Sequence, residues 1–182
     1  MRLVATEYLT LDGVFEEPGM WSGPFFNDEA GRFKWAELQA SEALLLGRKT
    51  YEGFVAAWPS MTDDARFADK MNGMAKYVVS ATLDHCDWSG SVLITGDVVE
   101  KIRTLKKQPG GDLLLSGSAQ LFNALSQEDV IDLYRLMVHP LILGKGRRLF
   151  AEGNDKKALT LTHAQTFSSG IAILEYEPTA RP

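Results

Sequence analysis

The strongest structural signal in the chain is Asp112-Leu-Leu-Leu-Ser-Gly-Ser-Ala-Gln-Leu-Phe122, in which a short apolar strand runs into Ser116-Gly117-Ser118 and then into a helical pattern. Backbone N–H groups at a helix N-terminus have no partner within the helix and lie at the positive end of its dipole. A turn of small residues there lets a pyrophosphate approach closely, and Gly117 permits that approach. A tight strand-to-helix turn without a ligand would need the same glycine. This segment alone therefore leaves both interpretations open.

Length and composition favour one domain over residues 1–182. The chain has 182 residues, of which 45% are hydrophobic, and can bury a substantial core. Its net charge of -5 opposes extended contact with nucleic acid or an acidic membrane, so the expected partner is a small organic molecule. No apolar run approaches the ~18 residues of a membrane span, and the N-terminal residues lack a signal-peptide core. We therefore expect a cytoplasmic protein.

The cysteine and histidine content gives no metal or disulfide signal. Cys86 is the single cysteine and cannot form an internal disulfide. The histidines, His85, His139 and His163, lie far apart and lack the spacing of metal ligands. His139 lies in an apolar strand before a proline, which favours a structural role over a catalytic one. No metal site is expected.

Short apolar strands alternate with helical patterns through the first two thirds of the chain. Strands are expected at residues 2–11, 43–46, 76–80 and 92–95 and before Ser116, with helices at about 27–42, 97–107 and up to about 126. Strands that are apolar on both faces belong to sheets covered by helices on two sides. A long strand is expected over 133–143, followed by an antiparallel hairpin of 159–167 and 171–176. The pattern predicts an α/β fold with a mixed sheet.

Two more strand ends carry groups suited to phosphate. Gly47-Arg48-Lys49-Thr50-Tyr51 follows a buried strand, and here Arg48 can fork onto phosphate oxygens while the Thr50 hydroxyl adds a further contact. A solvated surface charge pair is the alternative for Arg48 and Lys49. Val79-Ser80-Ala81-Thr82 places two hydroxyls at another strand end. Because ligands of open α/β sheets bind beyond the carboxyl ends of the strands, three such ends together favour a dinucleotide.

In their order and spacing these segments resemble the dihydrofolate reductase-like superfamily and, within it, stand-alone relatives of the riboflavin-biosynthesis reductase domain, the RibD C-terminal domain family. The Gly-Arg-Lys-Thr block is shared with dihydrofolate reductases, and the 138–150 block is typical of the riboflavin-reductase branch. The resemblance implies a three-layer sandwich, with a central, mostly parallel mixed sheet, helices on both faces and a C-terminal antiparallel hairpin. It rests on Leu9–Gly13, Leu45–Tyr51, Tyr77–Ser80, Leu115–Ser118 and Val138–Phe150.

The resemblance also implies an NADPH site. Many relatives carry a basic residue where this chain has Ala81, so the preference for NADPH over NADH is less secure here, and Arg48 or Lys49 is the alternative source of charge. The residues implied at the pyrophosphate are Gly47, Arg48, Lys49, Thr50, Gly117, Ser118, Ala119, Gln120 and Leu121, and those implied near the adenosine 2′-phosphate are Ser80, Ala81 and Thr82.

Catalytic and substrate residues are expected around the loop after the first strand. Asp12 stands where, in the family, a loop lies over the nicotinamide, and Asp28 begins the helix that lines the substrate cleft; either could relay a proton. An ordinary Asp-Gly turn is the alternative for Asp12, and helix capping is favoured for Asp28. An aromatic wall for a flat heterocycle is expected from Trp21, Phe25, Phe26 and Trp58, although large loop residues also pack as core.

The leading hypothesis is an NADPH-dependent reductase resembling the 5-amino-6-(5-phosphoribosylamino)uracil reductase of riboflavin biosynthesis, acting by hydride transfer to a small heterocyclic or sugar-bearing substrate. The alternatives are a dihydrofolate reductase-type pterin reductase and a nucleotide-binding protein without turnover. Residues 144–148 are expected to form a basic loop, and contact of this loop with a phosphorylated substrate is a further alternative. In relatives the late strands commonly form a homodimer contact, which suggests the same for Leu136–Val138 and Ile171–Leu174, with burial inside the monomer as the alternative.

Overall fold

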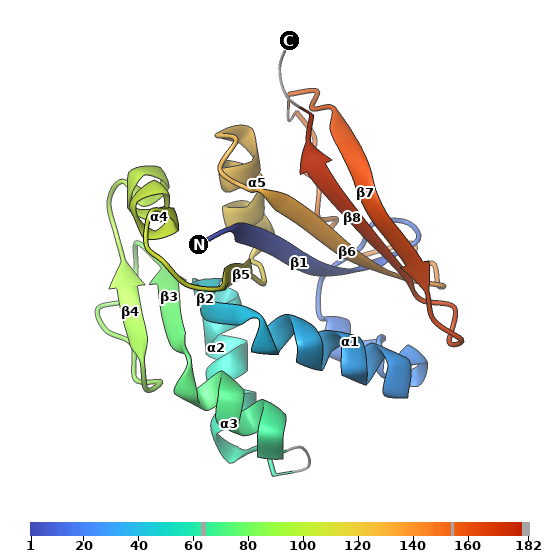
Figure 1. The fold of residues 1–182 in the computed structure, drawn as a ribbon, viewed down its shortest axis with the longest axis horizontal. Coiled ribbons are helices and arrows are strands. Elements are labelled where there is room, and N and C mark those ends of the chain that lie inside the picture. The colour runs from blue at the N-terminus through green and yellow to red at the C-terminus, as the bar shows by residue number, and fades with distance from the viewer. Residues whose placement is uncertain (63–64, 154, 180–182) are drawn as a thin grey trace.

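A twisted sheet with helices on both faces forms the body of the protein (Figure 1). The computed structural model describes residues 1–62, 65–153 and 155–179. The strands are β1 (Leu3–Thr10), β2 (Ser41–Gly47), β3 (Ala75–Val79), β4 (Ser91–Ile94), β5 (Asp112–Leu115), β6 (Leu133–His139), β7 (Leu159–Thr166) and β8 (Ala172–Pro178). The α-helices are α1 (Asp28–Gln39), α2 (Arg48–Ala57), α3 (Ala65–Gly73), α4 (Val98–Lys106) and α5 (Ala119–Gln127), and three short 3-10 helices are η1 (Pro18–Met20), η2 (Gly23–Phe25) and η3 (Trp58–Ser60).

The strand order is β4-β3-β2-β5-β1-β6-β8-β7. All neighbouring pairs from β4 to β6 are parallel, and β8 and β7 are antiparallel to their neighbours. This arrangement confirms the predicted mostly parallel mixed sheet with a C-terminal hairpin. In register, Gly47 of β2 lies opposite Val79 of β3, and Leu45 lies opposite Leu115 of β5. The three strand ends singled out in the sequence are therefore neighbours at one edge of the sheet.

Two layers of core separate the sheet from its helices. Helices α4 and α5 cover one face, and α1, α2 and α3 cover the other (Figure 1). Alternate residues of β2 point to opposite layers: Leu45 packs with Phe122 of α5, and Leu44 packs with Leu38 of α1 and Met71 of α3. Because these central strands are buried on both faces, they read as continuous apolar runs in the sequence.

Two predicted element ends are wrong. The first helix ends at Gln39 rather than near residue 42, because Ser41 already pairs with Asp112 of β5 and its hydroxyl donates to the Glu37 carbonyl oxygen at 2.7 Å. The strand predicted over 133–143 ends at His139, because Pro140 has no N–H to continue the ladder. In both cases the predicted element continues past the point where the real one ends. The helix gives way to the strand pairing of Ser41, and the strand ends before Pro140.

The late strands lie inside the sheet or along its edge. Residues Leu136 and Met137 of β6, Ile171 and Ile173 are buried within the monomer, while β7 forms the outer edge with most of its residues exposed. The homodimer stays a prediction. In the part of the chain that the structure describes, no helix is both long enough and apolar enough to cross a bilayer.

Candidate functional site

A cavity of about 990 Å³ opens where β2 and β5 end. After β2 the chain turns into α2 on one face of the sheet, and after β5 it turns into α5 on the opposite face (Figure 1). Neighbouring parallel strands whose connections leave to opposite faces create a crevice, which is where α/β sheets bind ligands. The cavity extends from this crevice past β1 and under α1, α2 and α3.

The wall of the crevice forms where the two strand-to-helix junctions come close together. The Gly47 N–H donates to the Gly117 carbonyl oxygen at 3.0 Å. A Cβ on Gly47 would lie 2.5 Å from Ser118 Oγ, and a Cβ on Gly117, whose φ is 79°, would lie 2.9 Å from Thr50 Oγ1. The peptide bond between Gly117 and Ser118 is cis. Only glycine fits at both positions, so the two junctions form a cradle of backbone and small side chains.

Two helices begin at this cradle without a side-chain cap. The N-cap of α2 is Gly47, which has no side chain, and the N-cap of α5 is Ser118, whose side chain makes no capping hydrogen bond. Lys49 and Thr50 of α2 and Ser118 line the cavity. Unpaired N–H groups and the positive ends of two helix dipoles suit an anion. The donor set therefore fits a pyrophosphate.

The other residues implied for the coenzyme surround the cradle. Arg48 is exposed and pairs with Glu52 at 2.8 Å, and Gln120 is exposed, whereas Ala119 and Leu121 are buried in the α5 layer. None of the four lines the cavity. At the end of β3, Ser80 Oγ accepts the N–H groups of Thr82 and Leu83 at 3.1 and 3.0 Å, and Ala81 and Thr82 are exposed. Ser80, Ala81 and Thr82 do not line the cavity either.

A buried acid lines the cavity beside the cradle. Glu7 of β1 is 5% exposed, and its Oε1 accepts the Gly117 N–H at 2.8 Å. Burial raises the pKa of Glu7 to about 8, and the Gly117 N–H only partly opposes this effect. At neutral pH the side chain is therefore mostly a neutral carboxylic acid. The strand holds a group that can release a proton into the cavity.

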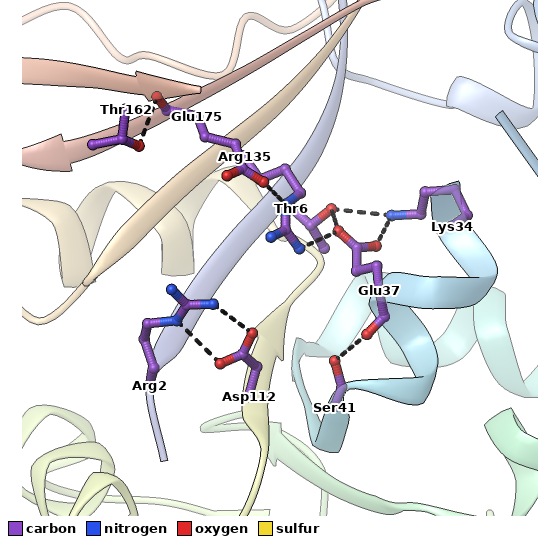
Figure 2. A network of polar contacts seen from close by, with 9 residues as sticks. All are labelled: Arg2, Thr6, Lys34, Glu37, Ser41, Asp112, Arg135, Thr162 and Glu175. Carbon is purple, nitrogen blue, oxygen red and sulfur yellow. Dashed lines mark hydrogen bonds and ion pairs between the residues drawn. The ribbon is translucent and has the colours of Figure 1, made fainter. Parts of the chain in front are cut away.

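A second set of buried charges surrounds Glu37, as Figure 2 shows, and two of its members, Lys34 and Glu37, also act electrostatically on Glu7. The Glu37 carboxylate of α1 accepts the Thr6 hydroxyl at 2.7 Å, the Lys34 ammonium, and Arg135 Nη1 at 3.1 Å. Arg135 also pairs with Glu175 at 2.5 Å. Burial by itself would raise the pKa of Glu37, but Lys34 and Arg135 hold it below its usual value. Each cation here already has a carboxylate partner.

The two predicted catalytic aspartates lie outside the cavity lining. The Asp12 carboxylate accepts the Thr10 hydroxyl at 2.6 Å and the N–H groups of Leu143 and Gly144 at 3.2 and 2.9 Å, and these contacts hold its pKa below the usual value. It thereby ties the loop after β1 to the loop after β6. Asp28 is exposed in the first turn of α1, where Asn27 supplies the cap by accepting the Ala30 N–H.

The predicted aromatic wall divides into two groups. Trp58 and Phe26 line the cavity. Trp21 and Phe25 instead pack edge-on against His139, with ring centroids 5.0 and 6.1 Å away. Burial lowers the pKa of His139, as expected for a core histidine. The basic loop contributes to the cavity through Arg147, whose N–H donates to Glu16.

Sequence reasoning missed Glu7, Lys34 and Glu37. The available signal was Glu7 itself, a single acid in the otherwise uncharged run from Leu3 to Leu11. The Lys34 and Glu37 pair has the i, i+3 spacing of an ordinary surface ion pair, and nothing in the spacing marks it as buried.

Comparison with known proteins gives the family. The model of the RibD C-terminal domain matches residues 2–173, nearly the whole chain. The chain belongs to the RibD C-terminal domain family. This membership confirms the resemblance inferred from the strand ends and the 138–150 block.

Other proteins of similar sequence or structure support the same fold. The uncharacterized protein YyaP of Bacillus subtilis (strain 168) is 28% identical over 179 residues, which cover 96% of this RibD C-terminal domain and 94% of YyaP. A crystal structure from Shewanella sp. PV-4, of a protein provisionally assigned to riboflavin biosynthesis, superposes with a TM-score of 0.79 at 18% identity, covering 99% of this chain and 100% of that one. Dihydrofolate reductase from Enterococcus faecalis, complexed with NADP(H), superposes with a TM-score of 0.66 at 16% identity, covering 98% and 97%.

Proposed function

We propose that this RibD C-terminal domain protein is a reductase that uses NADPH or NADH to reduce a small molecule. The observation that carries the proposal is the cradle, where Gly47 and Gly117 let two uncapped helix N-termini meet one ligand. Two phosphates need a double set of donors, which is what two adjacent N-termini offer. Family membership and the similarity to a dihydrofolate reductase complexed with NADP(H) support the same choice of ligand.

Different residues in and around the cradle would bind different parts of the coenzyme. The N–H groups at the start of α2 and α5 would hold the pyrophosphate, with Lys49 adding charge and the Thr50 and Ser118 hydroxyls adding hydrogen bonds. Ser80 to Thr82 lie two strands from β5, in the direction that the adenosine end would take. A bound reduced nicotinamide supplies a hydride to an electron-poor carbon.

We assign the role of proton donor to Glu7. Reduction of a polar double bond requires a proton at the atom that does not receive the hydride. Glu7 is protonated at neutral pH because it is buried, it lines the cavity, and its Gly117 contact fixes its position. Its carboxylic acid can donate a proton to the substrate and recover one from water that enters the cavity.

Isothermal titration calorimetry with NADPH and with NADH tests the cradle. The wild-type chain should bind at least one coenzyme, and Gly47→Ala should weaken binding at least about tenfold, because its new Cβ would lie 2.5 Å from Ser118 Oγ. Gly73→Ala is the matched control: nothing lies within 4 Å of its new Cβ, so affinity should stay unchanged. The proposal fails if neither coenzyme gives heat, or if both variants bind like the wild type.

A further inference from the structure

The inner part of the cavity differs in character from its mouth. We call it the inner chamber and define it by Leu38 of α1, Leu44 of β2, Phe54 of α2, Trp58 of η3, Met71 of α3 and Leu114 of β5, all of which line the cavity. Four of these side chains, Leu38, Leu44, Met71 and Leu114, are at most 5% exposed. The chamber thus lies between the sheet and the helices that cover it.

The walls of the inner chamber are hydrocarbon and aromatic. The Phe54 and Trp58 rings stand edge to face, with centroids 6.3 Å apart, and both are half-buried. The floor is made of the side chains that Leu44 and Leu114 direct to this layer of the core. A flat apolar molecule placed here would replace water against these surfaces, and each Å² of apolar surface removed from water contributes about 25 cal/mol.

The charges around the chamber oppose an anionic guest. Among the described residues that line the cavity, the cations are Lys34, Lys49 and Arg147. Lys34 is already paired with Glu37, and the other two are exposed residues, with Lys49 in the first turn of α2 and Arg147 in the loop after β6. A phosphate in the chamber would lose its hydration without gaining an unpaired cation, and it would lie near the Glu37 carboxylate.

One end of the chamber is polar. Thr6 and Glu7 in the middle of β1 and Ser116 directly after β5 line the cavity next to the cradle. A guest can therefore place one polar atom at this end, beside the Glu7 acid, while the rest of it contacts apolar side chains.

From these contacts we infer that the substrate is an uncharged, largely apolar ring compound with a single polar end, such as an aromatic ketone, and that it carries no phosphate. This inference rests on the proposed reductase function for its chemistry, but the chamber itself can be tested without coenzyme. It departs from the phosphoribosyl substrate that the family resemblance suggested, because none of the six residues that define the chamber is a cation, and the cavity's Lys49 and Arg147 are exposed residues outside it.

The test is fluorescence titration of the full chain with N-phenyl-1-naphthylamine, an uncharged dye that brightens in apolar sites. The wild type should bind the dye saturably at one site, with displacement by acetophenone and none by ribose 5-phosphate. Phe54→Glu, which puts a carboxylate into the chamber wall, should weaken dye binding at least about tenfold. Ala56→Glu is the matched control, since it adds the same charge to an exposed position of α2 and should bind like the wild type.

Circular dichroism verifies that both variants fold. If Phe54→Glu does not fold, Trp58→Gln replaces it, since Trp58 is the other half-buried residue of the wall. The inference is overturned if the wall variant binds the dye as tightly as the wild type, or if ribose 5-phosphate displaces it. Coenzyme calorimetry on the same samples separates the two proposals. Dye binding without coenzyme binding would remove the reductase and keep the chamber, and the reverse would remove the chamber alone.

Discussion

Replacing Glu7 by glutamine should change how the stability of the protein depends on pH. The glutamine keeps a side-chain oxygen that can accept the Gly117 N–H, but it cannot ionise. In the wild type, burial moves the pKa of Glu7 from 4.5 to about 8. At about 1.4 kcal/mol per pH unit, this displacement corresponds to about 5 kcal/mol that the folded state must supply when the side chain is ionised.

The direction follows from proton uptake. Below pH 4.5 Glu7 is neutral in both the folded and the unfolded chain. Between pH 4.5 and about 8 the unfolded chain has lost this proton while the folded chain keeps it, so the free energy of unfolding falls as pH rises. From about pH 5 to about pH 8 the wild type should lose about 3 to 4 kcal/mol relative to Glu7→Gln.

Urea denaturation followed by tryptophan fluorescence at several pH values measures this difference. Glu152→Gln removes an exposed carboxylate from a surface turn and should give a curve parallel to that of the wild type. If the Glu7→Gln curve is also parallel, Glu7 ionises as an ordinary surface acid, and its assignment as the proton donor loses its basis. With a substrate in hand, wild-type kcat should fall above about pH 8, and Glu7→Gln should lower kcat far more than it changes coenzyme affinity.

Two further changes test the polar contacts that shape the cavity. Glu37→Gln removes the negative charge that pairs with the buried cations Lys34 and Arg135, so it should lower the free energy of unfolding by about 3 kcal/mol in the same denaturation experiment. A loss under about 1 kcal/mol would mean that solvent already screens these charges. Asp12→Ala removes the acceptor of two N–H groups in the loop after β6, so trypsin should cleave at Lys145 or Arg147 faster than in the wild type. Equal cleavage rates would show that the remaining backbone pairing between the two loops suffices.

Much of the cradle could be predicted because its requirements are local. A buried apolar strand followed by a glycine has few backbone solutions, and Gly47 and Gly117 stand at such junctions in the sequence. The prediction that the two junctions meet required only the rule that parallel strands share a carboxyl edge. Helix α3 was not predicted, although its residues Phe67 and Met71 line the cavity.

The individual site residues were harder to predict. Trp21, Phe25 and Trp58 are all large aromatic residues of loops or short helices. Of these three only Trp58 lines the cavity, because it packs on the core layer of Leu44 and Met71, while Trp21 and Phe25 pack on His139. Asp12 had the position expected of a catalytic loop residue, but the loop after β6 lies close enough to use its carboxylate as a hydrogen-bond acceptor.

The sequence by itself determined an α/β fold with a mixed sheet, all of its strands, most of its helices and the glycine junctions, because each follows from hydrophobic periodicity or from backbone freedom within a few residues. Only the tertiary structure decided that Glu7 is a buried neutral acid and that the inner chamber is apolar. The protonation of an acid and the polarity of a cavity depend on which distant segments exclude water, and here those segments are α1, α3 and the Gly117 turn, which the chain brings together only on folding.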